Sequence, residues 1–430
     1  MEVHEILADL IKIQSVNPPG GETEAALYLK GLFDEAGIDN EIIESAPGRG
    51  SFFARLGGEA GPPAKSLLFL SHTDVVPVSE GWDFPPFCGE IRDGFVLGRG
   101  ALDCKNLVAA QAHALLHLAR NSRLQGRLIF AATADEEAAG TLGVHYLMEN
   151  HASLLTADFA VNEGAAEPVK VGNKVAYLIQ AGEKEPAWTT LRARGVSCHG
   201  SMPGLGDNAV ARMARAVAGL ADYIPRTVLI PQVKTLLQGL AAMKGMDEEV
   251  DESNVDRVIG LFEERAFAEY LRAITRMTVS PNVFHGGSKV NIVPDSSQAE
   301  VDIRVLPGQD REFVLSELRK ILEEGIEIDV PHFEPPTFSP TDSPHYRLIR
   351  DTLQGVVGDY ACLPCISSGA TDSRHLRRKS VPSYGVSIMS PGFDPSLRQT
   401  IHGKNERIDL ESLRLSSQFF IRLAESYLTG

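Results

Sequence analysis

Apolar and polar residues follow two periods along this chain, one typical of helices and one typical of strands. Apolar residues at three- and four-residue spacing predict an opening helix over 3–13 and a second helix from Thr23 to Gly37. Short apolar runs bounded by polar residues predict strands over 38–43 and 51–56. Helices and strands that alternate in this order favour an α/β fold built in layers.

Three further apolar runs, at 67–70, 127–132 and 157–161, each end in acidic or imidazole side chains. Runs of this length suit strands of the same sheet better than core helices. Open α/β sheets bind ligands at the carboxyl ends of their strands, so we expect these side chains to share one rim. They are His72 and Asp74, Glu136 and Glu137, and Glu163.

Each of these strand endings also has an ordinary explanation. Asp74 could cap its strand beside a surface His72, and the acidic run TADEEAAG could be a solvated turn. One such ending is common, whereas three in succession favour a shared site. Asp103, at the head of an expected helix over 104–120, and His402, in a later loop, are further candidate ligands.

From about residue 186 the pattern changes to that of a second, smaller domain. An acidic segment with helical spacing, 224–273, interrupts it and is interpreted as a surface insertion. We therefore predict one domain of residues 1–185 and 332–430, with the domain 186–331 inserted into it. The inserted domain is predicted to contain a strand, a helix, two strands, a helix and a strand, which is the order of a ferredoxin-like layer. In that order the predicted elements span 187–196, 207–221, 277–284, 298–305, 310–324 and 326–330.

Length and charge limit the classes of function. A chain of 430 residues exceeds what one hydrophobic core usually supports, which agrees with two domains. The formal net charge of −16 repels phosphate backbones and argues against a nucleic-acid partner. No apolar run approaches the roughly 20 residues of a membrane-spanning helix, and the acidic N-terminal segment does not resemble a signal peptide. We therefore expect a cytoplasmic protein with no membrane partner.

The cysteines carry no clear metal or redox signal. Five cysteines do not form a disulfide framework, and their odd number suits a reducing compartment. Cys362 and Cys365 form a CxxC pair that has no second pair to accompany it. We interpret them as two buried thiols rather than as a zinc or redox site.

Imidazoles and carboxylates form a candidate ligand set without thiolates. Such nitrogen and oxygen donors suit zinc, with Co²⁺ or Mn²⁺ as acceptable substitutes. The donors are too many for one tetrahedral ion but fit two ions that share a carboxylate, which would polarise a carbonyl and acidify a bridging water. The candidates are His72, Asp74, Asp103, Glu136, Glu137, Glu163 and His402.

The adjacent pair Glu136 and Glu137 could supply both a ligand and a proton carrier. Neighbours on extended chain face opposite ways, so one of them can bind an ion while the other stands over the water. From that position a carboxylate can carry a proton from water to a leaving amine.

Motifs along nearly the whole chain resemble those of the M20 family of zinc-dependent aminoacylases, carboxypeptidases and deacylases. The matching blocks occur in the family's order, which makes them far more specific together than singly. They include SVNPPGGE, SHTDVVPV, GRGALDCKN, TADEEAAG, NEG, GVSCHGSMP, KVNIVP, DIRVLPG, SGATDSR and IHGKNERI. The resemblance implies a zinc-peptidase-like α/β catalytic domain with an inserted ferredoxin-like lid and dimerisation domain.

The resemblance also implies a role for each candidate residue of the first domain. Asp103 would bridge two zinc ions, and its peptide bond to Cys104 would be cis. Asp74 would support an imidazole ligand, and Glu136 would be the general base and acid. The other ligands would be divided between the ions, His72 and Glu163 holding the first and Glu137 and His402 the second.

Further residues resemble groups that bind substrate. His199, in CHGSMP, resembles an imidazole that reaches the active site of the partner subunit and stabilises the oxyanion, which implies a homodimer. The long insertion at 224–273 leaves open whether that dimer contact is the common one. The groups that would hold the substrate carboxylate or oxyanion are Asn291, Arg304, Gly369, Thr371 and Arg374.

The sequence therefore predicts a two-zinc amidohydrolase that cleaves N-acyl amino acids or small peptides with a free carboxylate. Acetylornithine deacetylase-like and desuccinylase-like activities are the alternatives within this class. A non-catalytic metal-binding relative is the alternative of another class. Such a relative would lack Glu136 or a ligand, and none is missing here.

Overall fold

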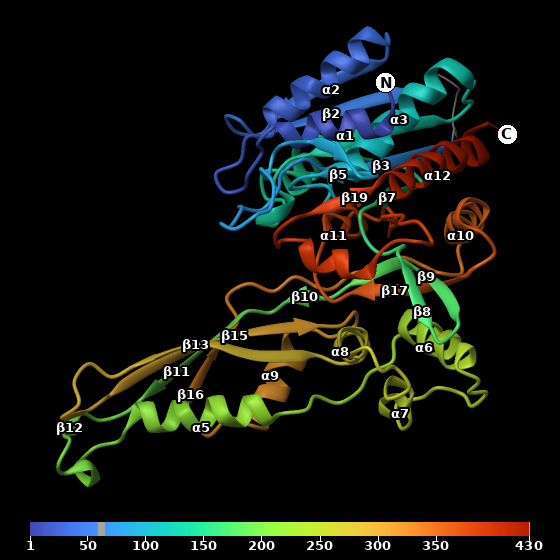
Figure 1. The fold of residues 1–430 in the computed structure, drawn as a ribbon. Coiled ribbons are helices and arrows are strands. Elements are labelled where there is room, and N and C mark those ends of the chain that lie inside the picture. The colour runs from blue at the N-terminus through green and yellow to red at the C-terminus, as the bar shows by residue number, and fades with distance from the viewer. Residues whose placement is uncertain (59–64, 430) are drawn as a thin grey trace. The chain divides into compact units, whose positions relative to one another are not determined.

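The computed structural model describes residues 1–58 and 65–429. It forms two compact units, each assembled from separate stretches of the chain (Figure 1). The first unit comprises Met1–Ala181, Phe338–Cys365 and Thr371–Gly430, and the second comprises Gly182–Thr337 and Ile366–Ala370. The sequence assigned residues 366–370 to the first domain, whereas the structure packs them with the second unit.

A nine-stranded sheet runs through the first unit. In sheet order its strands are β1 (Asp39–Glu44), β2 (Gly50–Leu56), β6 (Arg127–Thr133), β3 (Ser66–His72), β7 (Phe159–Asn162), β18 (Ser383–Gly385), β9 (Lys174–Glu183) and β17 (Ala361–Ser367), and β8 (Pro168–Val171) pairs with β9. The middle strands β6, β3, β7 and β18 are parallel. Their carboxyl ends therefore meet at one edge, where such sheets bind ligands.

Helices cover both faces of this sheet. On one face lie α1 (Val3–Lys12), α2 (Thr23–Glu35), α3 (Lys105–Asn121), α10 (Pro344–Val357) and α12 (Leu410–Leu428), and on the other lie α4 (Val144–Asn150) and α11 (Ser373–Arg378). On β3, Leu67 and Phe69 belong to the apolar core on one face of the sheet, and Leu68 and Leu70 belong to the core on the other face. A strand buried on both faces needs a continuous apolar run, which is why this strand stands out in the sequence.

The second unit contains a smaller antiparallel sheet. Its strands are β13 (Thr278–Gly286), β15 (Ser296–Val305), β11 (Thr189–Arg194) and β16 (Ile326–Asp329), with β10 (Glu185–Pro186) also paired to β15. α5 (Ala209–Asp222) and α9 (Arg311–Arg319) cover one face, where they pack on Ala299, Val301 and Ile303. Alternate residues such as Arg192 and Arg304 lie on the opposite, polar face. The predicted ferredoxin-like order of elements is confirmed.

The acidic segment between α5 and β13 is helical, as its spacing predicted, and it has a packed apolar interior. It contains α6 (Pro231–Met243), α7 (Val255–Ile259) and α8 (Arg265–Ala273). Leu236, Leu240 and Leu271 are fully buried, so the inserted segment is a packed helical module. Tyr270 on α8 donates a hydrogen bond to the backbone oxygen of Ile366 at 2.9 Å, which ties the module to residues 366–370.

Several elements were not predicted. They are α11, within the segment SSGATDSRHLRR, and the strands β8, β9 and β17. The remaining elements are β4 (Glu90–Arg92), β5 (Phe95–Leu97), β12 (Cys198–His199), β14 (Ile292–Val293), β19 (Arg407–Asp409) and the 3-10 helices η1 (Glu136–Ala138), η2 (Ala152–Leu154), η3 (Pro203–Leu205) and η4 (Pro395–Thr400). All five cysteines are free thiols. Within residues 1–58 and 65–429, no helix combines the length and apolar character needed to cross a membrane.

Candidate metal centre

His72 ends β3, and the residues that follow the strand fix its ring. The side chain is buried, with 1% of its surface exposed. Its Nδ1 lies 3.0 Å from the backbone oxygen of Asp74 and 3.3 Å from Oδ1 of the same residue. A ring held through one nitrogen presents the other, Nε2, to an ion.

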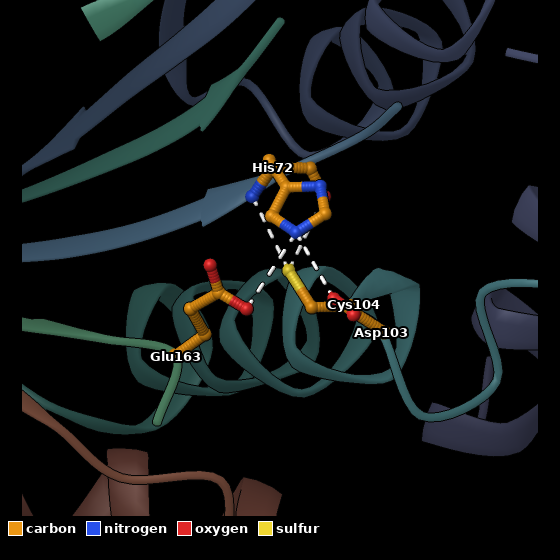
Figure 2. Close-up of side chains that lie close together, drawn as sticks. All are labelled: His72, Asp103, Cys104 and Glu163. Carbon is orange, nitrogen blue, oxygen red and sulfur yellow. Dashed lines mark hydrogen bonds and ion pairs between the residues drawn. The ribbon is translucent and has the colours of Figure 1, made fainter. Parts of the chain in front are cut away.

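Nε2 of His72 faces carboxylates from two other segments. It lies 3.2 Å from Oδ1 of Asp103 and 3.6 Å from Oε2 of Glu163 (Figure 2). Asp103 precedes α3, and Glu163 directly follows β7. The carboxyl ends of neighbouring parallel strands and the start of a helix therefore bring these three donors together.

Cys104 also belongs to this first group of donors, which the sequence did not foresee. The backbone N–H of His72 donates to Sγ of Cys104 at 3.4 Å (Figure 2). Burial raises the pKa of this thiol, so we expect it to stay protonated and to pair with the backbone of β3. The peptide bond between Asp103 and Cys104 is cis, which confirms the expectation from sequence.

A second group of donors consists of Asp103, Glu137 and His402. Nε2 of His402 lies 3.1 Å from Oδ2 of Asp103 and 3.3 Å from Oε2 of Glu137. Asp103 therefore turns Oδ1 toward His72 and Oδ2 toward His402. One oxygen for each group is the arrangement that a bridging carboxylate needs between two ions.

The chemistry of these donors fits divalent cations. Oε1 of Glu137 is buried, and no hydrogen-bond partner for it occurs in the part of the chain that the structure describes. A buried, unpaired carboxylate oxygen is costly unless a cation binds it. Hydrogen bonds to Asp103 and Glu137 raise the pKa of His402 to about 10, which reflects the negative charge gathered here. Imidazole and carboxylate donors in this number suit zinc.

Glu136 and Glu137 lie in η1, not on extended chain as expected. Asp135, directly before them, has a φ of 73° in the left-handed region. Oδ1 and Oδ2 of Asp74 accept hydrogen bonds from the backbone N–H groups of Glu136 at 3.2 Å and Glu137 at 3.1 Å. The chain turns because Asp74 captures these N–H groups, so one carboxylate positions both the His72 ring and the glutamate turn.

Glu136 is a carboxyl group beside the donors but outside both groups. Burial raises its pKa well above the ordinary value for a glutamate, and the nearby charge of Glu163 raises it further. A carboxyl group with a raised pKa can accept and return a proton near neutral pH. The arrangement can therefore combine metal binding with proton transfer.

A buried network of polar side chains supports the turn that carries Glu136 and Glu137. Nη2 of Arg49 lies 2.5 Å from Oδ1 of Asp135 and 2.9 Å from Oε1 of Glu22. Nδ2 of Asn17 donates to Asp74 at 2.8 Å and to Asp135 at 3.1 Å. The motif NPPGGE, to which the sequence assigned no role, supplies Asn17 and Glu22 to this network.

Two of the predicted substrate-binding residues, Thr371 and Arg374, lie in the first unit. Arg374 is on α11, and its Nη2 donates to the backbone oxygen of Ala139 at 3.0 Å. Asp372 lies between them, accepts a hydrogen bond from Thr133 at 3.3 Å, and has its pKa raised to about 7 by burial. These contacts join the loop after β17 to the segment that follows β6.

His199 and Asn291 lie next to each other in the second unit. His199 is exposed on β12, and its Nδ1 lies 2.8 Å from Oγ of Ser201. The backbone N–H of Gly200 donates to the backbone oxygen of Asn291 at 2.8 Å. The short pairing of β12 with β14 therefore holds these two predicted residues together.

Arg304 and Gly369 are the other predicted residues of the second unit. Arg304 lies on the polar face of β15, where its Nε donates to Oδ1 of Asp302 at 2.8 Å. The backbone N–H of Gly369 donates to Oγ of Ser367 at 3.1 Å. Arg304 is half-buried, so its guanidinium is held by a neighbouring carboxylate without being sealed from solvent.

Comparison with known proteins places the chain in a family. The sequence profile of peptidase family M20/M25/M40 matches residues 68–426, a span that contains every candidate metal ligand. The chain belongs to this family. It is accordingly a metal-dependent hydrolase that acts on C–N amide or peptide bonds, as the resemblance in the sequence implied.

Relatives with two different names are similar over most of the chain. The human N-fatty-acyl-amino acid synthase/hydrolase PM20D1 is 31% identical over 407 residues, which cover 90% of this chain and 78% of that protein. A probable succinyl-diaminopimelate desuccinylase of Staphylococcus epidermidis is 27% identical over 404 residues, which cover 90% and 89% of the two chains. The M20 chain is thus similar to enzymes whose names describe acylated amino acids.

Solved structures share the fold of this M20 protein. An M20 family metallo-carboxypeptidase, Sso-CP2, from Sulfolobus solfataricus superimposes with a TM-score of 0.73 at 20% identity and covers 99% of both chains. The dinuclear metal-binding peptidase YXEP of Bacillus subtilis gives a TM-score of 0.66 at 16% identity and covers 99% and 98% of the two chains. The α/β architecture with an inserted domain is therefore confirmed.

Proposed function

We propose that this protein is a co-catalytic two-zinc amidohydrolase that cleaves the amide bond of N-acyl amino acids or of small peptides with a free carboxylate. The observation that carries the proposal is the arrangement of Asp103, whose two oxygens face separate histidine–carboxylate groups. The similar human and staphylococcal proteins, whose names both describe an acylated amino acid, support the substrate class.

The ligands would divide between two ions. Asp103 would be shared, His72 and Glu163 would hold the first ion, and Glu137 and His402 would hold the second. Zinc suits these donors, and Co²⁺ or Mn²⁺ can replace it. When bound, the ions supply Lewis acidity, which polarises an amide carbonyl and lowers the pKa of water.

Glu136 carries the proton. Its carboxylate accepts the proton that the attacking water loses and then donates it to the nitrogen of the amide bond, so that the nitrogen leaves as an amine. Burial supports the second step, because it raises the pKa of Glu136 and favours the protonated form. Asp74 keeps the side chain in place by holding its backbone N–H.

Arg304 and Arg374 are assigned to bind the free carboxylate of the substrate. A guanidinium offers parallel donors that match the two oxygens of a carboxylate. Asn291, Gly369 and Thr371 add further hydrogen-bonding groups. Residues 366–370 are held by Tyr270 of the helical module, which supports a role for that module in substrate selection.

His199 is assigned to stabilise the oxyanion from the partner subunit of a homodimer. Large apolar side chains are exposed around it, a feature that favours a protein interface. They are Val196, Met202, Leu205 and Ile292. The backbone N–H of Met202 donates to the backbone oxygen of His199, and Ile292 pairs with His199 between β14 and β12.

A substrate panel tests the proposed function. Protein loaded with Zn²⁺ or Co²⁺ would be given N-acetyl, N-succinyl and long-chain N-acyl amino acids and dipeptides, with the methyl ester of each substrate as its matched control. We expect at least one free acid to be hydrolysed, with its ester hydrolysed much more slowly. Protein that binds two ions but hydrolyses no member of the panel would favour the non-catalytic alternative.

A further inference from the structure

A buried ion pair links the segments that carry Asp103 and His402. Arg99 lies in the motif GRGALDCKN and Glu406 in IHGKNERI, about 300 residues apart. Nη1 of Arg99 lies 2.6 Å from Oε2 of Glu406, and the two residues are only 1% and 0% exposed. Neither side chain belongs to a group of metal donors or to the proton transfer proposed above.

The Glu406 carboxylate binds the backbone that leads into Asp103. Its Oε1 accepts the N–H groups of Leu102 at 2.7 Å and Asp103 at 3.1 Å, and its Oε2 accepts the N–H of Gly100 at 3.2 Å. One carboxylate from the C-terminal segment therefore holds three N–H groups of the turn before α3. Charge-assisted hydrogen bonds of this kind are stronger than those between neutral groups.

Arg99, in turn, binds the backbone of the segment that carries His402. Its Nη2 donates to the backbone oxygen of Gly403, the residue after His402, at 2.8 Å. Its guanidinium also lies 5.2 Å from the centre of the Trp82 ring, a contact that restricts where the group can move. Each segment thus contributes one charged side chain that holds the backbone of the other.

We infer that Arg99 and Glu406 are positioning residues that set the separation between Asp103 and His402, and with it the affinity for the second ion. The inference rests on the proposed function, because Asp103 and His402 must bind a metal for it to hold. The pair acts through backbone atoms next to the two ligands. Partners that orient metal ligands from outside typically change metal affinity by roughly 10–100-fold.

The test is a calorimetric titration of metal-stripped protein with Zn²⁺. The wild type should bind two ions. In Glu406→Gln an amide NH₂ group replaces one oxygen and meets the donors of Arg99 and Gly100, so the second site should weaken by roughly 10–100-fold. The first site, which keeps His72 and Glu163 in place, should weaken much less. Hydrolysis by this variant should recover when zinc is in excess. Glu317→Gln, a buried carboxylate of the second unit, is the matched control and should bind as the wild type does.

Three outcomes would overturn the inference: wild-type affinity at both sites of Glu406→Gln, equal weakening of both sites, or activity that excess zinc does not restore. A wild type that binds no zinc would instead overturn the proposed function. Should circular dichroism show that Glu406→Gln is unfolded, Arg99→Lys replaces it in the same titration. Lysine keeps a cation beside Glu406 but cannot also reach Gly403, so the same selective weakening is expected, and wild-type affinity would contradict it.

Discussion

Glu136 and Glu137 are neighbours in the sequence but lie in different surroundings. Glu137 contributes Oε2 to the group around His402, while its Oε1 is buried and has no hydrogen-bond partner among the residues described. Glu136 belongs to neither group of donors, and burial raises its pKa. The difference explains why one of them is assigned to an ion and the other to a proton.

Glu136→Gln should lower kcat by about 10²–10⁴-fold, because the amide keeps the size of the side chain but cannot carry a proton. Metal content, measured by elemental analysis, should stay at the wild-type value. Glu149→Gln, which changes an exposed glutamate paired with Lys379, is the matched control and should leave kcat unchanged. Turnover by Glu136→Gln near the wild-type rate would show that another group carries the proton.

Zinc binding should release protons. The pKa of His402 is raised to about 10 by Asp103 and Glu137, so in metal-free protein this imidazole keeps its proton at every pH below about 10. An ion must displace that proton, and zinc affinity should therefore fall as the pH is lowered from about 8 to about 6. Titration in buffers of different ionisation enthalpy measures the released protons. His402→Ala should release fewer of them, and equal release by both proteins would contradict this assignment.

At the residue scale, side chains at strand ends were predictable and supporting side chains were not. His72 ends one apolar strand and Glu163 follows another, so their types and places in the sequence pointed to a shared rim. Arg49 supports Asp135 from 86 residues away, and no local pattern indicates such a pair. Cys104 contacts backbone atoms of β3, which leave no trace in the sequence.

The turn after β6 illustrates how a tertiary contact overrides a local pattern. An apolar strand followed by two glutamates suggested extended chain, but Asp74 captures the backbone N–H groups of both glutamates and Arg49 holds the residue before them. The chain therefore enters η1 instead of continuing as a strand. The central strands β6, β3 and β7 were predicted well, because burial on both faces of the sheet demands continuous apolar runs.

Arg49→Met should destabilise the turn and the first unit. It removes the cation from a pair of buried carboxylates, Glu22 and Asp135, and breaking a buried pair in this way typically costs about 3–5 kcal/mol of unfolding free energy. Arg55→Met is the matched control on β2, since its carboxylate partners are exposed and such surface pairs contribute about 0–1 kcal/mol. Urea denaturation measures both values. Similar losses in the two variants would contradict the support assigned to Arg49.

At the scale of the whole molecule, the order of elements was predictable and the packing of the helical module was not. Six segments of the second unit gave the ferredoxin-like order from their periodicity. The association of residues 366–370 with that unit depends on contacts such as the hydrogen bond from Tyr270 to Ile366, whose partners are 96 residues apart. Only the folded chain reveals which unit such a loop joins.

Leu205→Glu should separate the proposed homodimer into monomers. Leu205 is 71% exposed in the apolar surface around His199, and a charge there would have to be buried in a subunit interface. Leu27→Glu, at a 50% exposed position on α2, is the matched control and should remain dimeric. Sedimentation analysis distinguishes the two states. A wild-type protein that sediments as a monomer, or a Leu205→Glu variant that remains a dimer, would refute the proposed interface.

The most direct measurement of the central claim is a zinc titration of metal-stripped protein in which hydrolysis of the N-acyl amino acid panel is followed at each step. If two ions share Asp103, the rate of hydrolysis should reach its maximum at two zinc ions per chain. Full activity at one ion per chain, or no hydrolysis at any ratio, would contradict the two-metal account.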